Sequence, residues 1–85
     1  MPEISRFYGI IIRMFYNEHN PPHFHADYGE YKIVVDLKNE VIKGFMPKRA
    51  LKLIMEWTEI HKDELMENWD KCQNNVKPNN INPLK

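Results

Sequence analysis

The side chains best suited to chemistry are three histidines within seven positions, His19, His23 and His25. Asp27 follows two residues after the last of them. In an extended strand successive side chains point to opposite faces, so His23, His25 and Asp27 would project from the same face. The spacing therefore predicts a surface that carries two imidazoles and a carboxylate.

Three uses of this surface are consistent with the residues. The two strand imidazoles would serve as general acid and general base in metal-independent RNA cleavage, with Arg13 or Lys32 stabilising the charged intermediate. Alternatively, the same two histidines with either His19 or Asp27 would bind zinc or another divalent metal. In the third interpretation the histidines are structural and hydrogen-bond to nearby tyrosines or to the backbone. The sequence leaves these alternatives open.

The strands that position these side chains are predicted from their β-branched and aromatic residues. We predict an antiparallel meander of three to four strands, because turns rich in Asn, Pro and Gly separate the apolar segments. The predicted strands are Phe7–Tyr16, His23–Tyr28, Tyr31–Leu37 and a short Glu40–Phe45. Residues 1–6 are predicted to be a short lead-in to the first strand.

One long C-terminal helix is predicted to begin at Pro47, since proline is well tolerated at the first helical position. Its apolar stripe recurs every three or four residues, as a buried helix face requires. The stripe consists of Ala50, Ile54, Trp57, His61, Leu65, Trp69 and Cys72. The helix is expected to pack on one face of the sheet, over the row Ile10, Ile12, Phe24, Ala26, Ile33 and Val35. The fold class is therefore α+β, with the histidine pair on the opposite, open face.

Two other groups of residues also have two interpretations each. Lys48 and Arg49 fall in the first helical turn, where a helix N-terminus and two cations suit a nucleic-acid phosphate, with Lys32 as a further cation. Alternatively, they are ordinary surface residues, exposed or ion-paired. His61 lies in the apolar stripe, so it is either a hydrogen-bonded core residue or a fourth member of the histidine cluster.

Length and composition limit the classes of protein. The 85 residues suit one domain over residues 1–75, followed by an Asn- and Pro-rich tail over 76–85 whose Ile81 and Leu84 are able to dock on the domain or on a partner. The formal net charge is zero, so no overall attraction to nucleic acid or membrane is expected. The single Cys72 cannot form an internal disulfide, and no apolar run reaches the ~20 residues of a spanning helix. We therefore expect a cytoplasmic protein.

A family resemblance extends from about Ile4 to Asp70 and is carried by the segments RFYGIIIRMF, NEHNPPHFHADYGEYK, MPKRALKLIMEW and EIHKDELMENWD. These segments resemble a small prokaryotic family catalogued as domain of unknown function 4160. The resemblance implies a bacterial or archaeal protein commonly encoded beside another small protein, as in a toxin–antitoxin-like pair. It implies no activity. The positions that match its motif are His19, Pro21, Pro22, His23, Phe24, His25, Ala26, Tyr28, Arg49, Trp57, His61, Leu65, Asn68 and Trp69.

The leading functional hypothesis is a component of such a pair that binds RNA or its partner protein. Its activity would be RNA cleavage by His23 and His25, assisted by Arg13 and Asp27. The alternatives are a non-catalytic regulator or adaptor, and a metal protein that uses His19, His23 and His25. Apolar Ile11 and Phe15 are predicted on the open face, which would be covered by the neighbouring gene product or by a second copy in a homodimer.

Overall fold

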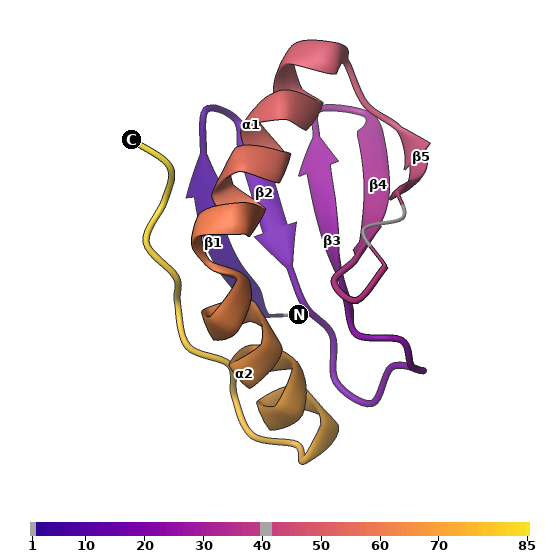
Figure 1. The fold of residues 1–85 in the computed structure, drawn as a ribbon, viewed down its shortest axis with the longest axis vertical. Helices are drawn as coiled ribbons and strands as arrows, with labels where there is room; N and C mark the ends of the chain where they lie inside the picture. Colours follow the sequence, from indigo (N-terminus) through magenta and orange to yellow (C-terminus); the bar gives the residue numbers. More distant parts are fainter. Residues whose placement is uncertain (1, 40–41) are drawn as a thin grey trace.

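The computed structural model describes residues 2–39 and 42–85 and shows an antiparallel sheet with two helices on one face (Figure 1). The five strands lie side by side in sequence order. Their bounds are Glu3–Phe7 (β1), Ile10–Arg13 (β2), His23–Tyr28 (β3), Tyr31–Asp36 (β4) and Ile42–Phe45 (β5). The helices are Lys48–Ile60 (α1) and Lys62–Gln73 (α2). The α+β class and the antiparallel meander are confirmed.

The predicted single strand from Phe7 to Tyr16 is wrong, as is the count of three to four strands. The predicted lead-in is also wrong over residues 3–6, because they belong to β1, which pairs with β2. The chain reverses at Tyr8 and Gly9, whose φ angles are 50° and 81°, and Phe7 pairs directly with Ile10. Two successive residues with positive φ form the mirror-image turn that fits the twist of a hairpin. Asparagine followed by glycine is the usual sequence signal of this turn. Here a tyrosine takes the place of the asparagine, so the sequence did not indicate a turn. Of the predicted fourth strand, Glu40 and Val41 lie outside the described residues.

The single long helix is also wrong, because the helical segment divides at His61, where φ is −110° and ψ is 23°. One turn earlier, the Thr58 hydroxyl donates a hydrogen bond to the Ile54 carbonyl at 2.7 Å, a contact that bends helices. Asp63 and Glu64 then lie in the first turn of α2, where acidic side chains favour a helix start. After this break, α2 runs beyond the ends of β1 and β2 (Figure 1).

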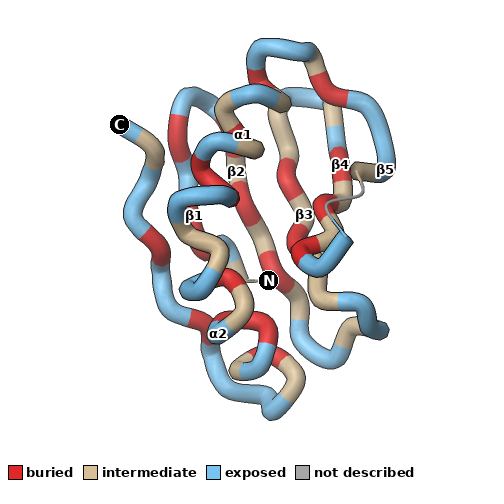
Figure 2. Tube along the Cα trace, in the orientation of Figure 1, coloured by how far each residue is buried: buried red, intermediate tan, exposed pale blue. Residues whose placement is uncertain are grey.

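The core lies between the helices and the sheet, and the buried face of the sheet is the one that strand alternation predicts. All six residues of the predicted row are at most 3% exposed. Trp57 from α1 is fully buried against them, with its ring centroid 5.3 Å from that of Phe7 and 5.9 Å from that of Phe24. Figure 2 shows buried segments alternating with partly exposed ones along β2, β3 and β4.

The C-terminal segment 76–85 runs beside β1 (Figure 1). The Ile81 amide donates a hydrogen bond to the Ile4 carbonyl at 2.7 Å, and the Ile81 side chain is buried. The Asn68 side chain both donates to the Asn79 carbonyl and accepts from the Asn79 amide, each at 2.9 Å. The segment therefore occupies the β1 side of the sheet, where an edge strand would otherwise present unpaired backbone groups.

Gly44 and Gly29 provide a matched test of the sheet. Both have positive φ, 103° and 59°, but a Cβ at Gly44 would lie 2.4 Å from the Lys32 carbonyl oxygen, whereas one at Gly29 would meet nothing within 4 Å. We expect Gly44→Ala to lower the free energy of unfolding by about 2–3 kcal/mol. Gly29→Ala should cost only about 1 kcal/mol, from its backbone conformation. Urea denaturation measures both, and equal losses would contradict the expected clash.

Candidate functional site

The open face of the sheet carries the predicted chemical residues. His23, His25 and Asp27 are partly exposed there, while Phe24 and Ala26 between them are buried. Strand parity therefore predicted the face of both imidazoles, although the His23 ring also contacts Trp69 of α2, with the centroids 5.1 Å apart.

Neighbouring strands bring cations to this face. Arg13 on β2 lies directly opposite His25 and forms an ion pair with the Asp27 carboxylate. Lys32 on β4 lies directly opposite Asp27. The structure thus brings together the predicted catalytic residues, which are Arg13, His23, His25 and Asp27. Of the predicted nucleic-acid-binding residues, Lys32 lies with them.

The sequence analysis missed Glu18, although this residue contacts both histidines. Its Oε1 atom lies 2.6 Å from Nε2 of His25 and 3.2 Å from Nε2 of His23. The Gln73 side chain of α2 donates a hydrogen bond to the Glu18 backbone carbonyl at 2.8 Å, which ties this loop to the helix layer. The only sequence signal was a carboxylate shortly before the histidines, and a loop conformation decides whether such a residue reaches them.

His23 is oriented by its other ring nitrogen. Its Nδ1 lies 2.8 Å from the Pro21 carbonyl oxygen, which can only accept, so Nδ1 carries the proton and donates it. In neutral His23 the lone pair is then on Nε2, the atom that faces the Glu18 carboxylate. Two acceptors face each other there unless a proton or a metal ion lies between them. The arrangement is therefore suited to holding a positive charge.

Glu18 is ionised at neutral pH. Burial raises the pKa of this carboxyl, but the hydrogen bond and charge of His25, together with those of His23, outweigh burial and hold the pKa below its ordinary value. Glu18, His23 and His25 offer three ligand atoms that all lie within 4.8 Å of one another. One carboxylate and two imidazoles are a ligand set that suits zinc.

Two adjacent hollows flank this cluster. The first, of about 340 Å³, is lined by residues that include His19, His23 and Lys43. The second, of about 420 Å³, is lined by residues that include His25, Lys32 and Lys43. Lys43 on β5, which the sequence analysis did not single out, therefore lies beside both histidines. His19 is exposed beside the first hollow, and Glu18 is the third member of the described cluster.

Phe15 and Ile11 are both partly exposed. The Phe15 ring packs edge-on against His25, with the centroids 4.5 Å apart. An aromatic side chain thus borders the second hollow beside the histidine.

The remaining predicted residues lie elsewhere. Arg49 lines a pocket with Ile10 and Tyr28, which belong to the helix-facing side of the sheet. Lys48 lines a separate hollow near β5. His61 contacts Trp57 with ring centroids 5.5 Å apart, and its Nδ1 lies 2.6 Å from Glu64 Oε1. None of the three joins the histidine cluster of the described residues.

Cys72 lies in the helix layer and is fully buried. Burial raises the pKa of its thiol, so it does not serve as a nucleophile at neutral pH.

Comparison with known proteins identifies one family. The family model for a domain of unknown function, DUF4160, matches residues 9–70. No curated protein and no solved structure matches the chain significantly. In the part of the chain that the structure describes, neither helix is long and apolar enough to cross a membrane.

Proposed function

The chain belongs to the DUF4160 family, and we propose that it binds a divalent metal ion, best zinc, through Glu18, His23 and His25. The observation that supports this function is the convergence of three ligand atoms within 4.8 Å of one another. The Pro21 carbonyl already holds the second nitrogen of His23, which is how metal-binding histidines are oriented in proteins.

The coordination chemistry is consistent with this proposal. A tetrahedral zinc ion with bonds of about 2.0–2.1 Å needs ligand atoms about 3.3 Å apart. Glu18 Oε1 lies 3.2 Å from Nε2 of His23, which matches this spacing, whereas its 2.6 Å distance from Nε2 of His25 is a hydrogen-bond distance that would lengthen by about 0.7 Å around the ion. Three protein ligands leave a fourth position open, as in catalytic zinc sites. The hollow with Lys32 and Lys43 lies beside His25, so an anion bound there would be next to the ion.

Titration of the untagged full chain with Zn²⁺ by calorimetry, and with Co²⁺ by absorbance, tests the metal site. We expect one ion per chain, with His25→Ala weakening affinity at least about 100-fold and Glu18→Gln about 10- to 100-fold. His61→Gln is the matched control and should leave the affinity within about twofold, because it lies outside the cluster.

Circular dichroism confirms that each variant is folded. His19→Ala tests whether Glu18 or His19 is the third ligand beside His23 and His25. The variant should keep the metal affinity within about twofold if Glu18 is that ligand. Wild-type affinity in His25→Ala would contradict the metal site.

The second candidate is RNA cleavage by the histidines without a metal, within a toxin–antitoxin-like pair. The specific observation in its favour is the hollow that His25 shares with Lys32 and Lys43, because two cations beside an imidazole would bind a phosphodiester next to a general base. Glu18 would orient His25 through its 2.6 Å contact. A small partner encoded by a neighbouring gene and a homodimer stay predictions.

A further inference from the structure

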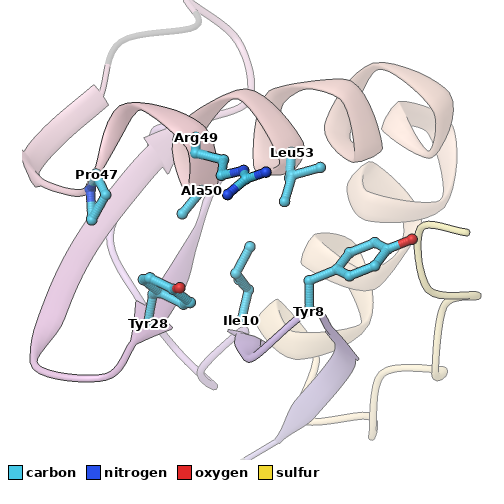
Figure 3. Close-up of a pocket in the computed structure, with 7 residues that line it drawn as sticks. All are labelled: Tyr8, Ile10, Tyr28, Pro47, Arg49, Ala50 and Leu53. Carbon is cyan, nitrogen blue, oxygen red and sulfur yellow. The ribbon is translucent and has the colours of Figure 1, made fainter.

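A pocket of about 520 Å³ lies on the helix-facing side of the sheet, beside the β1–β2 turn (Figure 3). Its size is typical of small-molecule sites. Four of its seven lining residues are apolar, Ile10, Pro47, Ala50 and Leu53, and the other three are Tyr8, Tyr28 and Arg49. Figure 3 shows Arg49 directed toward the space above Ile10, with the rings of Tyr8 and Tyr28 on two sides. A ligand here would meet rings, aliphatic groups and a single cation.

Within the part of the chain that the structure describes, the positive charge at this pocket is not neutralised. Helix α1 begins without a side-chain cap and without an acidic residue in its first turn. Arg49 is exposed, and among residues 2–39 and 42–85 its side chain has no hydrogen-bond or ion-pair partner. A free guanidinium beside the positive end of a helix complements an anion, with a carboxylate or phosphate as the natural partner.

Tyr8 provides a second, independent observation. Its φ of 50° is unfavourable for a bulky residue, and glycine or asparagine normally occupies such a turn position. The residue is also 59% exposed, so burial in the core does not account for a tyrosine there. The turn therefore carries an aromatic ring at some expense of stability, and that ring lines the pocket.

We propose that this pocket binds a small aromatic carboxylate. The ligand ring would lie between Tyr8 and Tyr28 above Ile10, and its carboxylate would accept hydrogen bonds from Arg49. A nucleotide is disfavoured, because its ribose and base would bring polar atoms against apolar walls that offer them few partners. This site goes beyond the proposed metal function, since it lies on the opposite side of the sheet from the histidine cluster.

Amide NMR titration of the full chain with indole-3-acetate tests the site, with neutral indole as the matched ligand control. We expect a Kd on the order of 1 mM or below, with shifts at Gly9, Ala50 and Leu53, and at least about tenfold weaker binding of indole. Arg49→Gln should weaken binding about tenfold or more. Lys48→Gln removes the adjacent cation, which lines another hollow, and should change the Kd by less than about twofold.

Tyr8→Asn separates a ligand-binding role from a structural one. Asparagine tolerates positive φ, so this variant should melt at or above the wild-type temperature while binding indole-3-acetate about tenfold more weakly. Unchanged binding in this variant would overturn the proposal. Equal affinities of indole and indole-3-acetate, equal losses in Arg49→Gln and Lys48→Gln, no amide shifts at about 5 mM ligand, or tighter binding of AMP at the same amides would also overturn it.

Discussion

Replacing Trp57 with alanine should remove most of the free energy of unfolding and leave a marginally stable chain at 25 °C. Trp57 is fully buried and packs against Phe7, Phe24 and His61. Its indole N–H also donates a hydrogen bond to the Asn82 carbonyl at 2.9 Å, which holds the C-terminal segment. Removing a buried aromatic side chain costs about 3–5 kcal/mol, whereas a small domain has a total stability near the lower end of about 5–15 kcal/mol. Urea denaturation followed by circular dichroism measures the loss.

Trp57→Phe separates the packing of this side chain from its hydrogen bond. Phenylalanine keeps most of the buried ring but cannot donate to Asn82, so we expect a loss of about 1–2 kcal/mol and a cooperative transition. Amides in segment 76–85 should exchange faster with solvent in this variant. A Trp57→Ala chain with the wild-type urea midpoint would contradict the central role of this residue in the core.

In the RNA-cleavage hypothesis, His25→Ala should lower the rate by about 10²- to 10⁴-fold, the usual contribution of a general acid or base. His25 is the imidazole that shares a hollow with Lys32 and Lys43 and that Glu18 contacts at 2.6 Å. The assay uses the full chain with single-stranded RNA and follows the rate of product formation. His61→Gln is the matched control and should cleave at the wild-type rate, because it is not part of this hollow.

A chelator distinguishes the two proposed functions in the same assay. An unchanged rate with EDTA would assign the histidines to acid–base chemistry, whereas a rate lost with EDTA and restored by Zn²⁺ would assign them to the metal site. Equal rates for wild type and His25→Ala, or no cleavage by the wild type, would contradict the RNA-cleavage hypothesis. The metal titration remains a separate test in each case.

The faces of the strands could be read from the sequence because strand alternation is a local property of the backbone. Every extended residue reverses the direction of the next side chain, so Phe24 and Ala26 had to oppose His23 and His25. The apolar stripe around Ile54, which identified the buried helix face, depends on a similarly local period.

The positions where the chain turns or breaks were harder to predict. Tyr8 occupies a turn that asparagine would have marked, and apolar residues on both sides continued the strand pattern through it. Likewise, the helix break at His61 interrupts an apolar stripe that runs on unchanged to Cys72. In both places the apolar pattern continues along the sequence although the strand or the helix is interrupted.

The sequence by itself determined the α+β class, the buried row of the sheet and the open position of the two strand histidines, because these follow from the periods of strands and helices. Only the tertiary structure decided that Glu18 meets both imidazoles and that Arg49 lies away from them. A loop has no period, so the position of Glu18 depends on contacts such as the one from Gln73 on α2. Distances between elements likewise depend on how the helices cross the sheet, which no local pattern records.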